Sequence, residues 1–213
     1  GGSSHMEEAE AVAVGIRRRG GNAAAYRADV RDRAALDAML GDASLRLGPI
    51  GALVCCAGVA QQKLFQDITD EDWDRMFDIN IKGVYRSIQA ALPYLMKRER
   101  SRIVTFSSMW GQVGASCESH YAASKGAVIA LTQSLAKELG PSGVRVNCVS
   151  PGTILTDMTA VLGQETLDAL AEETPLERNG SPEDAARAAA FLCSEAADFI
   201  TGQVVAVNGG YIV

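Results

Sequence analysis

A tyrosine and a lysine four positions apart, Tyr121 and Lys125, form the most informative pair of side chains in this sequence. On a helix this spacing places both side chains on one face. A cation beside a phenol favours the phenolate and lowers the tyrosine pKa from its usual value of about 10. Such a tyrosine can donate a proton to a carbonyl oxygen, or accept one from an alcohol, near neutral pH. An ordinary surface pair has the same spacing, so the pair alone leaves both interpretations open.

Ser108 follows the apolar run Arg102–Phe106 and could hydrogen-bond and orient the same substrate oxygen. In doubly wound sheets, ligands bind beyond the carboxyl ends of the strands. Small residues gather at such ends here and would let a ligand approach the backbone closely. They would equally suit plain strand-to-helix turns. The other strand ends are Asp29-Val30, Cys56-Ala57-Gly58 and Ser150-Pro151-Gly152.

Helical and strand patterns alternate along the chain, which favours one α/β domain over residues 7–213, a doubly wound and mainly parallel sheet. The apolar run Ile50–Cys56 shows no alternation and predicts a strand covered on both faces. The first six residues resemble the remnant of an expression tag. Helices are predicted over Glu7–Arg19, Arg33–Leu47, Thr69 or Asp70 to Lys97, Ser119–Glu138 and Pro182–Cys193, the last capped by Ser181; the other strands are Ala23–Ala28 (weak), Arg102–Phe106, Val144–Val149 and Gln203–Val207.

Composition excludes several classes of protein. The 213 residues carry 20 Lys+Arg against 26 Asp+Glu, so we expect no nucleic-acid partner. The apolar runs are too short for a membrane span. Two histidines cannot build a His-rich metal site, and we expect no metal. The five cysteines include no Cys-x-x-Cys pair, which indicates a reducing, cytoplasmic compartment.

The spacing of Ser108, Tyr121 and Lys125 resembles the short-chain dehydrogenase/reductase family. The resemblance extends from Glu7 to Val213 and implies a Rossmann-like fold. It also implies reversible hydride transfer between NADP or NAD and a small carbonyl/alcohol substrate. The matching segments are Arg102–Ser108, Tyr121–Lys125, Val144–Asn147, Ser150–Thr153, Thr156–Met158 and Ile200–Gly210.

The resemblance implies a role for each matching residue. Tyr121 would be the general acid/base, Ser108 would orient the carbonyl, and Lys125 would lower the tyrosine pKa and hold the nicotinamide ribose. Asn80, in Asp78-Ile79-Asn80-Ile81, matches the family's helix-interrupting Asn, which supports a water relay to the lysine. The cofactor-binding positions implied are Asp29, Val30, Cys56, Ala57, Gly58, Tyr121, Lys125, Pro151, Gly152, Ile154 and Thr156. From the residues alone, a helix N-cap explains Asp29 equally well.

The sequence departs from the family in two places. The strand, Gly-rich turn and helix that open the family's fold and receive the pyrophosphate do not occur here, so we expect an N-terminally incomplete sheet. Ile50–Cys56 would then be an exposed apolar edge. We expect self-association, rearrangement near residues 7–60, or a preceding segment that this sequence omits. Cys56 replaces the family's Asn, which predicts a looser cofactor pocket and, less favoured, a reactive thiol.

The substrate class is left open by these motifs. The pattern is similar to 3-oxoacyl-[acyl-carrier-protein] reductases and also to sugar, polyol and steroid dehydrogenases. Residues 153–177 would form a substrate lid, while Met109, Trp110 and Cys117 would line the pocket or simply pack. The resemblance implies homodimers or homotetramers paired through residues 70–98 and 119–138. The alternative function is an inactive, truncated fragment that acts only as an oligomerising module.

Overall fold

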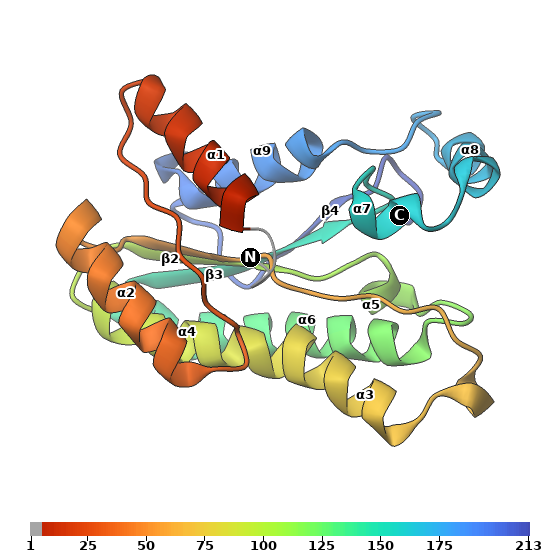
Figure 1. The fold of residues 1–213 in the computed structure, drawn as a ribbon, viewed down its shortest axis with the longest axis horizontal. Helices are drawn as coiled ribbons and strands as arrows, with labels where there is room; N and C mark the ends of the chain where they lie inside the picture. The colour runs from red at the N-terminus through yellow and green to blue at the C-terminus, as the bar shows by residue number, and fades with distance from the viewer. Residues whose placement is uncertain (1–5) are drawn as a thin grey trace.

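The computed structural model describes residues 6–213, which form a parallel β-sheet with helices on both faces (Figure 1). The sheet has four strands in the order β1-β2-β3-β4, and each neighbouring pair is parallel. This arrangement confirms the predicted α/β class. The strands are β1 (Ala52–Cys55), β2 (Ser101–Phe106), β3 (Val144–Pro151) and β4 (Val204–Val207).

The helices begin close to where the sequence predicts, because polar side chains cap them. Ser181 accepts a hydrogen bond from the backbone N–H of Asp184, and Thr69 accepts one from Asp72. Each forms a capping box, which satisfies N–H groups that a helix terminus leaves unpaired. The helices are α1 (Met6–Arg18), α2 (Arg33–Leu47), α3 (Asp70–Phe77), α4 (Gly83–Leu95), α5 (Trp110–Val113), α6 (Ser119–Leu139), α7 (Asp157–Ala160), α8 (Gln164–Glu173) and α9 (Pro182–Cys193).

The two faces of the sheet pack against different helices. Helices α2, α4 and α6 cover one face, and α9 lies over the other (Figure 1). Successive residues of β2 point to opposite faces. Ile103 accordingly belongs to the larger core cluster and Val104 to the cluster formed with Leu192 of α9, and all three side chains are fully buried. A strand buried on both sides explains the unbroken apolar pattern of β2.

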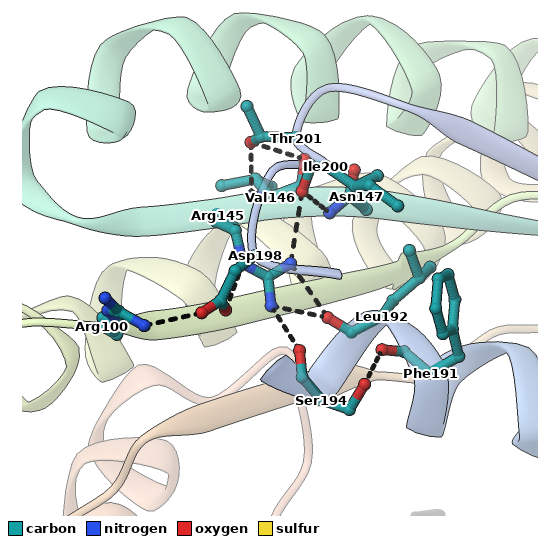
Figure 2. Close-up of polar contacts among 10 residues, drawn as sticks. All are labelled: Arg100, Arg145, Val146, Asn147, Phe191, Leu192, Ser194, Asp198, Ile200 and Thr201. Carbon is teal, nitrogen blue, oxygen red and sulfur yellow. Dashed lines mark hydrogen bonds and ion pairs between the residues drawn. The ribbon is translucent and has the colours of Figure 1, made fainter. Parts of the chain in front are cut away.

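Arg145 of β3 ties the last helix and the last strand to the sheet (Figure 2). Its guanidinium donates hydrogen bonds to the carbonyls of Leu192 and Ile200, at 3.0 and 3.2 Å between N and O, and pairs with Asp198. The neighbouring Asn147 donates to the Ile200 carbonyl at 2.8 Å. The bond to Leu192 satisfies a carbonyl that the end of α9 leaves open, and the bonds to Ile200 hold the segment that precedes β4. They thereby fix where β4 begins alongside β3.

The strand predicted over Ala23–Ala28 does not form. That segment crosses from α1 to α2 without helix or strand structure. A strand needs a hydrogen-bonded neighbour, and within residues 6–213 none lies beside this segment. The expectation that Ile50–Cys56 is covered on both faces is also wrong. Val54 is 43% exposed, so one face of β1 is uncovered there. Strand β1 lies at the edge of the four-stranded sheet, which confirms the other expectation, that this run is an apolar edge strand.

The long helix predicted from Thr69 to Lys97 is interrupted. Helix α3 passes into a π-helical segment, Asp78–Lys82, and α4 then runs only to Leu95. The resemblance implied this interruption at Asn80, whereas the hydrophobic period did not show it. Single π-helical turns inside α-helices are frequent at functional sites. The interruption therefore places Asn80 at a candidate functional position.

Candidate active site

A cavity of about 1270 Å³ opens beyond the carboxyl ends of β2 and β3. Its position follows from the topology, because parallel strands bring their carboxyl ends to one edge of the sheet. Helix α6 borders it and contributes Tyr121 and Lys125, one turn apart. Most of the candidate site residues lie on its wall. These are Cys56, Gly58, Ser108, Tyr121, Lys125, Pro151, Gly152, Ile154 and Thr156.

Lys125 is a buried ammonium at the base of this cavity. Its side chain is 6% exposed, and Nζ donates a hydrogen bond to the Phe106 carbonyl at 3.0 Å. Burial lowers the pKa of Lys125 to about 8. Ser107 holds the same stretch of helix, since its hydroxyl donates to the Lys125 carbonyl at 2.8 Å. The lysine is therefore anchored from β2 at both its backbone and its charged end.

Tyr121 and Ser108 face the same cavity and are both largely buried. Burial raises the pKa of Tyr121, and a hydrogen bond with Ser108 partly counters this. The expected lowering of this pKa by Lys125 is absent. The Lys125 Nζ lies 5.8 Å from the centre of the tyrosine ring and is bonded to the Phe106 carbonyl. Its charge is consequently directed toward the strand rather than toward the phenol oxygen.

Asn80 fixes the loop that crosses the floor of the site. Its Oδ1 accepts a hydrogen bond from the Val59 N–H at 2.8 Å, and its Nδ2 donates to the Val59 carbonyl at 2.9 Å. Nδ2 also donates to the Ser124 hydroxyl at 3.1 Å, which links the loop to α6. The neighbouring Gly58 packs closely, because a Cβ there would lie 3.3 Å from the Lys125 Nζ and would push the ammonium aside by a few tenths of an ångström. The amide thus holds bare backbone against the lysine.

The segment after β3 forms another wall of the cavity. Pro151 ends the strand, and Gly152 packs so closely that a Cβ there would lie 2.8 Å from the Asn208 Cα. Ile154 pairs with Gly180 in an isolated parallel bridge, and Thr156 caps α7. All four predicted positions in this segment therefore lie together. Further along, Met158, Val161, Leu162 and Leu170 bring apolar side chains of the expected lid region to the cavity.

The predicted adenine contacts lie apart from this group. Asp29 forms an ion pair with Arg31 at 2.7 Å, and the hydrogen bonds of that guanidinium lower the pKa of Asp29 to about 2. Val30 faces a second cavity of about 270 Å³, together with Ala57. Cys56 lines both cavities. The two groups of candidate residues therefore meet only at the end of β1.

Sequence reasoning missed several polar residues of the larger cavity, among them a hydrogen-bonded pair. Glu118 and Gln62 both line it, and the Gln62 amide donates to the Glu118 carboxylate at 3.3 Å. The available signal was position, because Glu118 immediately precedes the helix that carries Tyr121. Met109 and Trp110 line the cavity as proposed, whereas Cys117 is exposed and is not among the lining residues.

Cys56 shows no sign of an activated thiol. Burial raises its pKa, and the nearby charge of Lys125 opposes this only as a lesser effect. A thiol with a raised pKa carries little thiolate at neutral pH and is a weak nucleophile. In the described part of the chain, no cluster of three or more His, Cys, Asp or Glu could hold a metal ion. Nor is any helix there long and apolar enough to cross a membrane.

Comparison with known proteins decides the family. The family described as enoyl-(acyl carrier protein) reductase matches residues 3–212. The 3-oxoacyl-[acyl-carrier-protein] reductase FabG of Staphylococcus aureus is 38% identical over 204 residues, which cover 96% of this chain and 83% of the relative. The chain belongs to the short-chain dehydrogenase/reductase family. It is accordingly assigned to the NAD(P)-dependent oxidoreductases.

Two solved structures show how closely the fold of this short-chain dehydrogenase/reductase is shared. A short-chain dehydrogenase/reductase of Brucella melitensis, described as a glucose/ribitol dehydrogenase, is 42% identical with a TM-score of 0.83, over 87% of this chain and 75% of that one. A gluconate 5-dehydrogenase of Burkholderia cenocepacia, solved with NADP and tartrate, is 29% identical with a TM-score of 0.90. That alignment covers 96% of this chain and 81% of the other. The Rossmann-like architecture predicted from sequence is confirmed.

Proposed function

We propose that this chain reduces a small carbonyl compound, or oxidises the corresponding alcohol, with Tyr121 as general acid/base. The observation that carries the proposal is the convergence of Ser108, Tyr121 and Lys125 on one wall of a single large cavity. Ser108 hydrogen-bonds the substrate oxygen, and Tyr121 delivers the proton to it. A positioned proton donor of this kind is worth about 10²–10⁴ in rate.

The residues present fit a nicotinamide cofactor at this cavity. The Lys125 ammonium has three N–H donors, and among residues 6–213 its one hydrogen-bonded acceptor is the Phe106 carbonyl. The remaining donors suit ribose hydroxyls, and bare backbone at Gly58 leaves room for them. When bound, NADP or NAD supplies or accepts the hydride. Lys125 holds the ribose, Asn80 holds the loop beneath it, and Pro151, Gly152, Ile154 and Thr156 surround the carboxamide.

The adenine end of the cofactor would extend over Cys56 and Ala57 toward Asp29 and Val30. This part of the proposal is supported by the continuity of the two cavities at Cys56. The family's Gly-rich turn does not occur in these 213 residues. Affinity for the pyrophosphate is therefore the quantity to measure first.

The test is calorimetric titration of the purified, mass-checked chain with NADPH and then NADH. We expect binding in the micromolar range, followed by loss of NADPH absorbance when a β-keto ester is added. Comparing the two cofactors decides between NADP and NAD. No binding at millimolar cofactor would overturn the proposal for this chain and leave the oligomerising module as its function.

We also propose a carrier-protein-bound β-ketoacyl thioester as the natural substrate and the cytoplasm as the compartment. Similarity to the Staphylococcus aureus reductase supports the first, and free thiols at all five cysteines support the second. Of the two surface positions where carrier-protein reductases tend to be basic, Glu99 is flanked by Arg98 and Arg100 and the other is Ser142. Replacing Arg98 and Arg100 by Glu should raise the KM for the carrier-bound substrate but not for a small ester.

We further propose that the chain forms homodimers or homotetramers through α3, α4 and α6. Trp73 and Tyr85, which lie on α3 and α4, are 37% and 47% exposed, and Trp73 stacks on Phe77 with ring centres 4.9 Å apart. Large exposed aromatic side chains are typical of protein interfaces. Light scattering should give twice or four times the mass of one chain. The double variant Trp73→Glu, Tyr85→Glu should shift it to the monomer.

A further inference from the structure

The large cavity carries an unusual balance of charge for a site that binds a small polar substrate. Among the described residues on its wall, the acidic and basic side chains are Glu118, Asp157 and Lys125. Among residues 6–213, no arginine lines it and Lys125 is its one lysine. A substrate carboxylate or phosphate in a protein site is usually held by arginine or lysine. This wall therefore offers such a group little.

Lys125 does not hold a carboxylate or phosphate of the substrate. Its ammonium is buried, donates to the Phe106 carbonyl and, under the proposed function, holds the cofactor ribose. A cation used in this way is directed at the floor of the site rather than at the substrate. The charge that a substrate meets is thus set by the carboxylates.

Glu118 is the carboxylate nearest the chemistry by position in the chain. It lies one turn before Tyr121, immediately before α6. Its carboxylate accepts the Gln62 amide at 3.3 Å, and both side chains line the cavity. Its negative charge contributes to raising the pKa of Tyr121, as a smaller effect than burial. Burial also raises the pKa of Glu118, and the hydrogen bond from Gln62 opposes this by stabilising the carboxylate.

The far side of the cavity is apolar. Met158 and Val161 follow β3, Leu170 lies on α8, and Ala186 and Ala190 lie on α9. These side chains can cover a hydrocarbon chain but cannot solvate a charge. The wall is thus divided into a carboxylate end near Tyr121 and an apolar end.

We propose that this site selects uncharged carbonyl substrates with an apolar tail, and that Glu118 is the specificity-determining residue that rejects an anionic group beside the carbonyl. The inference rests on the proposed function and narrows its substrate class. It favours neutral keto esters and thioesters over keto acids.

The test compares ethyl acetoacetate with acetoacetate as substrates for NADPH oxidation by the full chain. The native chain should prefer the ester in kcat/KM. In Glu118→Gln the ester-to-acid preference should fall about fivefold, which corresponds to about 1 kcal/mol and is the size of one charge–charge interaction near a solvated protein surface. Glu138→Gln is the matched control, because Glu138 is exposed near the opposite end of the same helix. It should leave the preference unchanged.

Equal use of acid and ester by the native chain, or an unchanged preference in Glu118→Gln, would overturn the inference. Calorimetric binding of ethyl 3-hydroxybutyrate and 3-hydroxybutyrate separates this failure from failure of the proposed function. A chain that transfers no hydride yet binds the ester more tightly than the acid keeps the charge selection and loses only the reaction. Equal binding of the two would reject the selection itself.

Discussion

Two regions of the molecule, the central strands β2 and β3 and residues 6–56, differ in burial and in strand pairing. Strands β2 and β3 have neighbours on both sides, and their side chains Ile103, Val104, Val146 and Val149 are fully buried. Residues 6–56 include an edge strand, a segment without secondary structure and the side chain of Leu45, which is 88% exposed. The reason is that a parallel strand is stabilised by partners on both edges and layers on both faces.

The two groups of candidate site residues are held by these two regions. Ser108, Tyr121 and Lys125 follow or contact the doubly covered strand β2, and Lys125 is bonded directly to it. Asp29, Val30 and Cys56 depend on β1 and on the segment before α2. The catalytic half of the site therefore rests on a strand with two neighbours, while the adenine half rests on the edge strand and on a segment without helix or strand structure. Four experiments test this difference between the two regions.

The largest effect is expected from Tyr121→Phe. Removing the hydroxyl takes away the proposed proton donor and should lower kcat by about 10²–10⁴ without changing the thermal midpoint. The matched control is Tyr26→Phe in the N-terminal region, where the hydroxyl donates only to the exposed Asp42. That variant should retain kcat within about twofold. Similar losses in both would contradict the division between the two regions.

The second largest effect is expected from shortening an apolar side chain in each region. Ile103→Ala should lower the free energy of unfolding by about 2–5 kcal/mol, because the side chain is fully buried in the larger core cluster. Leu45→Ala should change it by less than about 0.5 kcal/mol, since that side chain is mostly in water. Urea unfolding of both variants measures the difference. Comparable losses would mean that α2 is buried in solution.

Lys125→Met should stabilise the protein. The native lysine has a pKa of about 8 in the folded chain against 10.5 as its ordinary value. Below pH 8 both the folded and unfolded chains hold the proton, so the cost of burying it is fully present. Between pH 8 and 10.5 only the unfolded chain keeps the proton, and the stability of the native protein rises with pH.

The variant should therefore be more stable at pH 7 by about 2–3 kcal/mol, with the gain shrinking toward pH 10.5. Urea unfolding at pH 7 and 9.5 tests both parts. Lys137→Met, at an exposed position on the same helix, is the matched control and should change the free energy of unfolding at pH 7 by less than about 0.5 kcal/mol. A destabilised Lys125→Met at pH 7 would show that the hydrogen bond to Phe106 outweighs the burial of the charge.

The free energy of local opening should be smallest for residues 24–30. Their amides should exchange with solvent almost without protection, because they belong to no helix or strand. Amides of β3 should exchange only through global unfolding. Hydrogen exchange followed by mass spectrometry compares the two regions within one sample. Slow exchange at residues 24–30 would indicate that the segment pairs with another strand, as in self-association through β1.

Local signals in the sequence determined much of the fold. Helices α2 and α9 occupy the predicted ranges because Asp32 and Ser181 cap them. The spacing of Tyr121 and Lys125 placed both on one helical face, and the unbroken apolar runs identified β2 and β3. These are properties of neighbouring residues, so they can be read from the chain directly.

Only the tertiary structure decided what depends on distant partners. Ala23–Ala28 has the composition of a strand but lacks a neighbour to bond with, and Val54 is exposed because its side chain lines the two cavities instead of packing under a helix. The pKa of Tyr121 is raised because burial outweighs its hydrogen bond with Ser108. Glu118 became part of the site only when the strand ends met at one cavity. Pairing, burial and convergence are set by elements far apart in the sequence, which no local pattern records.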